Sequence, residues 1–196
     1  MPKRVDRQER RTLIADALMR VAARQGLEAV SLRHVAHEAG VSAGMVQHWF
    51  RTKDEMMTFA MTVVRDRAQT RVTDALSRLG GDPPRRLLLR TMITAILPLT
   101  EESRADGRVA LAFLAYAAVR PAAAASLREE NAQLLAFVAD LIEGPDRDEL
   151  AAGLLALMEG LGIYLLGGHY SAERALAALD AHLDLICGSA DRAVPG

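Results

Sequence analysis

The 196-residue sequence contains a single cysteine and little that suggests export or a membrane. Because Cys187 has no second cysteine to pair with, an intramolecular disulfide is excluded. A signal segment would be apolar, whereas the first residues of this sequence are charged. We therefore expect the protein to work in a reducing cytoplasm. The longest uninterrupted apolar run, residues 109–119, covers 11 residues. A membrane span needs roughly 18, and no membrane partner is expected.

Motifs of the common catalytic classes are also missing. The sequence has no Gly-x-Ser-x-Gly turn, no glycine-rich phosphate loop followed by Lys-Ser/Thr, and no His-Glu-x-x-His motif. His34, His37 and Glu38 are close in sequence, but no Cys or further His is placed to complete a tetrahedral metal site. We therefore predict no enzyme activity, no cofactor and no metal.

Charge is divided unevenly along the chain, although the formal net charge is only −1. Residues 1–53 carry a net charge of +5, and residues 54–196 carry a net charge of −6. Such an asymmetry can reveal a basic module that the total conceals. The positive charge belongs to the N-terminal part of the chain.

Apolar residues recur at helical rather than alternating spacing almost everywhere, which predicts an all-α chain. The first helix is expected to begin at Asp6, which forms a capping-box-like pair with Glu9, and to stop at Gly26. Thr52 and Glu55 form a second capping box, which is expected to open a long helix. The helices expected after the first are residues 32–39, 43–50, 53–79, 84–97, 103–119, 122–143, 146–167 and 172–187.

Two of these helices are short and are joined by a tight turn. Ser31 and Ser42 are placed to cap them, and Gly40 can end the first by adopting a left-handed conformation. Ala36 is small enough to let the second helix cross closely. The residues expected to pack the inside corner are Val35, Val41 and Val46. This arrangement fits the helix-turn-helix unit, whose second helix enters the major groove of DNA.

At these residues the chain resembles the tetracycline-repressor (TetR) family of bacterial transcription regulators. The resemblance covers about residues 8–60 in motif detail, whereas the C-terminal half matches the family in helix count and length. The Ala-rich helices of that half, broken at Pro121, resemble those of the betaine-regulator subgroup. The family usually has tyrosine where this chain has Gln47, so direct readout of adenine becomes possible. The matching segments are Ser31-Leu32-Arg33-x-Val35-Ala36, Ala39-Gly40-Val41-Ser42 and Phe50-x-x-Lys53-x-Glu55-Met56.

The resemblance implies a DNA-binding domain of residues 1–52 and a helical, ligand-binding and dimerising domain of residues 53–196. The residues expected at DNA are Ser31, Arg33, Ser42, Ala43, Gly44, Met45, Gln47, His48, Trp49 and Lys53. Ser31 would contact a phosphate, Trp49 and Lys53 would flank phosphates, and Arg33 would reach a base edge or the backbone. Trp49 has an alternative role as a core residue of the small domain. The basic tail of Lys3, Arg4, Arg7, Arg10 and Arg11 is either a further DNA arm or a solvated end.

The C-terminal region is expected to hold a small effector and to dimerise. Candidate effector contacts, which are also typical of simple core packing, are Met92, Ile96, Phe113, Tyr116, Phe137, Met158 and Tyr164. Candidate dimerisation residues are Leu154, Leu157, Leu161, Leu176, Leu179 and Leu183. The predicted protein is a homodimeric repressor that a small apolar or aromatic effector releases from a palindromic operator. The alternative is a helical-bundle enzyme or carrier whose N-terminal module only contacts other proteins.

Overall fold

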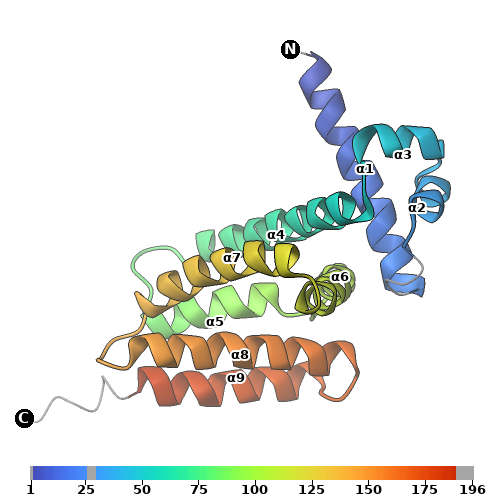
Figure 1. Ribbon diagram of the computed structural model, residues 1–196. Helices are drawn as coiled ribbons and strands as arrows, with labels where there is room; N and C mark the ends of the chain where they lie inside the picture. Colours follow the sequence, from blue (N-terminus) through green and yellow to red (C-terminus); the bar gives the residue numbers. More distant parts are fainter. Residues whose placement is uncertain (1, 26–29, 189–196) are drawn as a thin grey trace, which may run out of the picture. The chain divides into compact units, whose positions relative to one another are not determined.

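The computed structural model describes residues 2–25 and 30–188, which contain nine helices and no strand (Figure 1). The all-α prediction is confirmed, because the chain also matches an all-α family of solved structures described below. The helices are α1 (Pro2–Gln25), α2 (Leu32–Ala39), α3 (Ala43–Trp49), α4 (Lys53–Ser77), α5 (Arg85–Ile96), α6 (Glu101–Ala118), α7 (Pro121–Ala139), α8 (Arg147–Leu166) and α9 (Ala172–Cys187).

The predicted helix boundaries agree with the structure to within a few residues except at the start of α1 and at the end of α7, which stops at Ala139 and not at residue 143. The expected start at Asp6 is wrong, because α1 already begins at Pro2. Proline is favoured in the first turn of a helix, where its missing N–H would have no partner, and this outweighs a side-chain cap four residues later. The basic residues before Asp6 therefore belong to a helix and not to a tail. The predicted stop at Gly26 lies outside the described residues.

By contacts between backbones, the chain forms two compact units. Unit 1 comprises residues 1–67 and 105–123, and unit 2 comprises residues 68–104 and 124–196. The division passes through the interiors of α4, α6 and α7 rather than through loops. It does not follow the predicted boundary between residues 52 and 53, which rests on the helix-turn-helix motif alone and stays a prediction.

Unit 1 is built around the packing of α1 on α2 and of α2 on α3. The apolar stripe of α1 is buried at Ile14 and Leu18, which are 1% and 0% exposed. Val35 of α2 and Val46 of α3 are both fully buried, as expected for the inside corner of the turn. Burying each such side chain stabilises the fold by about 1.5–3 kcal/mol relative to leaving it in water. The three helices therefore share one small core.

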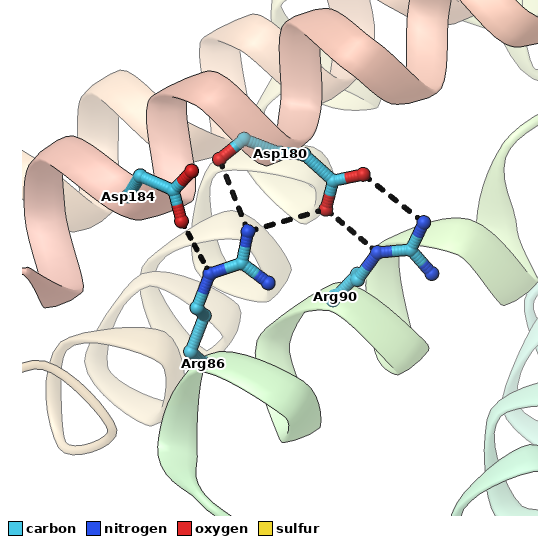
Figure 2. Close-up of polar contacts among 4 residues, drawn as sticks. All are labelled: Arg86, Arg90, Asp180 and Asp184. Atoms are coloured by element: carbon cyan, nitrogen blue, oxygen red, sulfur yellow. Dashed lines mark hydrogen bonds and ion pairs between the residues drawn. The ribbon is translucent and has the colours of Figure 1, made fainter.

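Unit 2 is held by the packing of α9 against both α5 and α8. Its core is aliphatic and includes the fully buried Leu154, Leu165, Leu179 and Leu183. A polar cluster also joins α5 to α9, and it is formed by Arg86, Arg90, Asp180 and Asp184 (Figure 2).

In this cluster both arginines of α5 reach the acidic residues of α9 (Figure 2). The Arg90 guanidinium donates to both carboxylate oxygens of Asp180, at 2.6 and 3.1 Å. Arg86 donates to Asp184 at 2.6 Å and also reaches Asp180. Two parallel hydrogen bonds between a guanidinium and a carboxylate fix the orientation as well as the distance of the pair.

Helix α8 is strongly apolar, although most of it is not buried within the chain. It is the one described helix that is long and apolar enough to cross a membrane by length and composition, although a single such helix is weak evidence for a span. Only 28% of its most apolar window is buried inside the chain. An apolar helix that its own chain leaves so exposed calls for another covering surface.

Candidate DNA-binding site

The turn between α2 and α3 is built from local backbone chemistry. The hydroxyl of Ser31 accepts a hydrogen bond from the His34 backbone N–H at 3.2 Å, which caps α2. Gly40 follows the end of α2 with φ 69° and ψ 28°, in the left-handed region. The Gly40 N–H donates to the His37 carbonyl, and the next N–H, of Val41, donates to the Ala36 carbonyl. These are the two hydrogen bonds of a Schellman motif.

Helix α3 presents one face to solvent and one to the core. The Ser42 hydroxyl caps it by accepting from the Met45 backbone N–H at 3.1 Å. Val46 is fully buried, whereas the neighbouring Gly44, Gln47 and His48 are exposed. Because α3 is anchored at Val46, its exposed residues form a defined surface.

The remaining predicted DNA contacts lie near this surface in unit 1. Arg33 and Ser42 are exposed, and Ser31 is half-buried. Ala43, Met45 and Lys53 are also half-buried, as is Trp49, whose indole meets the His48 ring edge-on at 5.1 Å. Half-burial suits both roles predicted for Trp49, a phosphate contact and a packing residue.

The segment between α3 and α4 is ordered by two further contacts. The Glu55 N–H donates to the Thr52 hydroxyl at 3.1 Å, as a capping box predicts. The Glu55 carboxylate, however, accepts from the backbone N–H of Arg51 at 2.9 Å rather than from that of Thr52. The reciprocal half of the box is therefore displaced by one residue, and it fixes the backbone that leads into Lys53.

Arg11, which the sequence offered as part of a DNA arm or of a solvated end, makes a contact that the sequence did not reveal. Its guanidinium lies over the rings of Phe50 and Phe59, at 5.1 and 4.4 Å from their centroids. Phe50 is fully buried and ends α3, so the contact ties α1 to the end of the exposed helix. The only signal in the sequence was an arginine on the apolar side of α1, and that spacing does not identify its partner.

A charged cluster joins α1 and α2. The Glu38 carboxylate accepts from Arg20 at 2.6 Å and from Arg24 at 2.5 Å. Hydrogen bonding from Arg20, aided by the charge of Arg24, lowers the pKa of Glu38. Glu38 thus remains ionised and satisfied next to the two arginines. Among residues 2–25 and 30–188, no group of three His, Cys, Asp or Glu side chains is placed to hold a metal ion.

The predicted effector contacts fall in both units. In unit 1, Phe113 and Tyr116 are buried and their rings stack, with centroids 6.2 Å apart. In unit 2, Met92 is buried on α5, and Ile96 lies one turn further along the same helix. The other three belong to unit 2 as well: Met158 is half-buried, and Phe137 and Tyr164 are 52% and 46% exposed. Exposure of these two rings places them at the surface of the single chain.

The predicted dimerisation leucines need a correction. Leu154, Leu161, Leu179 and Leu183 are at most 2% exposed and belong to the core of unit 2. Side chains enclosed by their own chain leave no surface for a second chain to cover. Leu157 and Leu176 are only half-buried, and the exposed apolar residues of α8 and α9 lie at other positions of the same helices.

The capped turn, the buried anchor and the exposed face of α3 define a helix-turn-helix DNA-binding protein with a larger helical region attached. Residues 14–58 match the family described as bacterial regulatory proteins, tetR family. Residues 84–188 match the family described as BetI-type transcriptional repressor, C-terminal. The chain belongs to the TetR family and is a DNA-binding transcriptional regulator of the BetI-type repressor group, not an enzyme.

Whole-length relatives agree with these matches. The transcriptional regulator PksA of Bacillus subtilis (strain 168) is 31% identical, over 95% of this chain and 94% of its own. A solved transcriptional regulator from Rhodococcus sp. Rha1 is 35% identical with a TM-score of 0.84, over 94% and 99% of the two chains. A regulator from Saccharomonospora viridis, solved in complex with choline, has a TM-score of 0.72 over 90% and 94% of the chains. At 22% identity, this last likeness shows the fold alone.

Proposed function

We propose that this regulator acts as a homodimeric repressor that binds a near-palindromic operator and leaves it when a small effector binds. The observation that carries the proposal is the exposed face of α3, anchored by the fully buried Val46 and capped by Ser42. A recognition helix must present its outer side chains to base edges while its inner side is fixed to the protein. A protein of this kind acts in the bacterial cytoplasm.

Within this proposal, the exposed residues of α3 read the bases. Gln47 pairs with adenine through its amide, and Gly44 lets the backbone approach the groove closely. Arg33 reaches a base edge or the backbone, and Lys53 neutralises a phosphate at the start of α4. The other positions predicted above, including His48 and the two capping serines, line the same surface. Phosphate contacts set the register, and base contacts set the sequence preference.

The dimer is proposed to form through the exposed apolar face of α8 and α9. On α8 this face contains the exposed Ala152, Ala156 and Ile163 and the half-buried Gly160, and on α9 it contains the exposed Ala177, Ala181 and Leu185. A Cβ atom on Gly160 would meet nothing within 4 Å, so the chain's own packing does not require glycine there. Small residues on such a face allow two helices of a second copy to approach closely. This replaces the enclosed leucines with surface positions on the same two helices.

Two-fold symmetry would place the two α3 helices about 34–36 Å apart, one turn of DNA. To release the operator, an effector need only bind more tightly to a state of the dimer in which the two α3 helices have a different spacing. A preference of about 1.4 kcal/mol shifts that equilibrium tenfold, and about 5.5 kcal/mol reverses it from 99:1 to 1:99. The effector class we propose is small and apolar or aromatic, because the candidate contacts in both units are apolar or aromatic. Choline, the ligand in the S. viridis complex, is a small cation and not an apolar molecule, so it serves as the contrasting probe.

Selection of bound fragments from random duplex DNA tests the proposal. We expect a near-palindromic sequence with half-sites one turn apart, and an affinity that falls steeply between about 50 and 200 mM salt as counterions are released. A protein that stays monomeric and ignores every duplex at low salt would refute the proposal and would favour a carrier whose N-terminal module contacts proteins.

Three variants then separate the roles of the site. Lys53→Ala should weaken binding to all duplexes, whereas Gln47→Ala should change the selected sequence. Arg78→Ala is the control for charge, because it removes one positive charge from an exposed position in unit 2. Equal losses on every sequence for Lys53→Ala and Gln47→Ala would remove Gln47 from base readout.

A further inference from the structure

Two polar links join α6 to α4, the helix that follows the helix-turn-helix, and one of them also reaches α1, the helix that precedes it. We infer that Arg67 and Tyr116 are positioning residues for DNA binding: through them, α6 holds the DNA-reading helices in the orientation that fits an operator. The inference rests on the proposed function, since it requires α3 to read DNA. It extends that function to residues outside the motif.

The first link is a guanidinium shared by three helices. Arg67 of α4 donates to Asp16 of α1 at 2.7 Å and to Asp106 of α6 at 3.2 Å. The Asp106 side chain is only 3% exposed, and removing one partner of a buried ion pair is strongly destabilising. Arg67 also approaches the Met19 sulfur of α1 at 3.9 Å. One side chain therefore fixes α1, α4 and α6 to one another.

The second link lies at the start of α4, next to Lys53. The hydroxyl of Tyr116, on α6, donates a hydrogen bond to the carboxylate of Asp54. The Arg120 guanidinium covers one face of the tyrosine ring, 3.8 Å from its centroid, and Phe113 stacks on the ring as well. Burial and the nearby Asp54 carboxylate raise the pKa of Tyr116, so the hydroxyl remains a donor at neutral pH. The ring is thus held on several sides and cannot swing away cheaply.

The spacing of the links determines what they do. They are 13 residues apart on α4 and 10 residues apart on α6. These separations correspond to about 20 Å and about 15 Å along the helix axes. A single link would let one helix pivot on the other, whereas two distant links fix direction as well as position. The same links lie inside unit 1, which combines residues 1–67 with residues 105–123.

This coupling affects sequence-specific binding more than non-specific binding. Non-specific affinity depends on how many phosphates the basic side chains neutralise, and it tolerates small changes of orientation. Specific affinity requires base contacts in a fixed register at both half-sites. Loosening α6 should therefore lower the ratio of operator affinity to random-duplex affinity. A mere loss of folded protein would lower both affinities by the same factor.

The experiment compares three variants of the full-length protein on the selected operator and on a random duplex. Asp106→Asn removes the buried charge of the first link. Tyr116→Phe removes the hydroxyl of the second link, keeps the stacked ring and leaves the charge unchanged. The control, Asp180→Asn, neutralises a carboxylate that an arginine also holds, but in unit 2 (Figure 2). All are measured where sedimentation shows the same oligomeric state as the wild type.

We expect Asp106→Asn and Tyr116→Phe each to raise the operator dissociation constant about three- to tenfold, in the range of measured couplings through packed networks. The random-duplex dissociation constant should change by less than about twofold. Asp180→Asn should leave both dissociation constants, and so their ratio, unchanged. Equal changes on both duplexes, or an unchanged ratio in Tyr116→Phe, would overturn the inference. If Asp106→Asn does not fold, Tyr116→Phe decides alone. A wild-type protein that selects no operator would instead refute the proposed function.

Discussion

Replacing Gly40 by alanine isolates the contribution of the left-handed turn to stability. The backbone at Gly40 has φ 69° and ψ 28°, where an L-residue pays about 1–2 kcal/mol. A Cβ atom there would meet nothing within 4 Å, so no clash with neighbouring residues adds to this cost. We expect Gly40→Ala to lower the free energy of unfolding by about 1–2 kcal/mol. The corresponding fall in Tm is about 2 to 8 °C for a chain of this size.

Urea denaturation at one fixed protein concentration measures this change, because the stability of a dimer depends on concentration. Gly162→Ala is the matched control: Gly162 lies within α8, and an added Cβ would touch only Pro98 at an ordinary 3.8 Å. That variant should gain about 0.5–1 kcal/mol from helix propensity. Gly40→Asn should be milder than Gly40→Ala, since asparagine visits the left-handed region more readily. Equal shifts of the same sign in Gly40→Ala and Gly162→Ala would refute the reasoning.

Three further predictions concern the core, the polar cluster and the dimer. Phe50→Ala should cost about 3–5 kcal/mol in urea denaturation, because it empties a fully buried site and removes a face for the Arg11 guanidinium. Hydrogen bonds from Arg90 lower the pKa of Asp180. The stability this gives is therefore present above the unfolded carboxyl pKa of about 4 and lost as the pH falls through the lower folded value. Unfolding curves from pH 2 to 7 should then lose less stability on acidification in Asp180→Asn than in the wild type. Leu185→Glu should produce monomers in sedimentation, whereas Leu13→Glu, at an exposed leucine of unit 1, should not; a dimeric Leu185→Glu would contradict the proposed interface.

The capped turn was predictable because its physics is local. Ser31, Gly40 and Ser42 act on backbone groups within four residues of themselves, and each has the conformation and the hydrogen bond that its residue type predicts. The predicted start of α1 at Asp6 was wrong for an equally local reason: the proline in the first turn lets the helix begin before the Asp6–Glu9 pair.

Which apolar residues of α8 and α9 the chain covers itself could not be predicted, for a different reason. Helices α8 and α9 are apolar on more than one side, and periodicity gives no indication of which side the chain covers itself. Leu179 is enclosed, whereas Leu185, six residues further along and on another side of the same helix, is 72% exposed. Long-range partners were equally hidden. Nothing in the sequence near Arg67 indicates that it reaches both Asp16 and Asp106, residues 51 and 39 positions away.

The division of the chain through the interiors of α4, α6 and α7 limits how this regulator can be taken apart. A graft of residues 1–52 onto another effector-binding region would leave Arg67, Asp106 and Tyr116 behind. The transplanted residues 1–52 would then lose the side chains that set the orientation of the DNA-reading helices. Chimeric regulators should therefore exchange α4 and α6 together with residues 1–52. Recombination that gives a natural regulator a new operator would be subject to the same constraint.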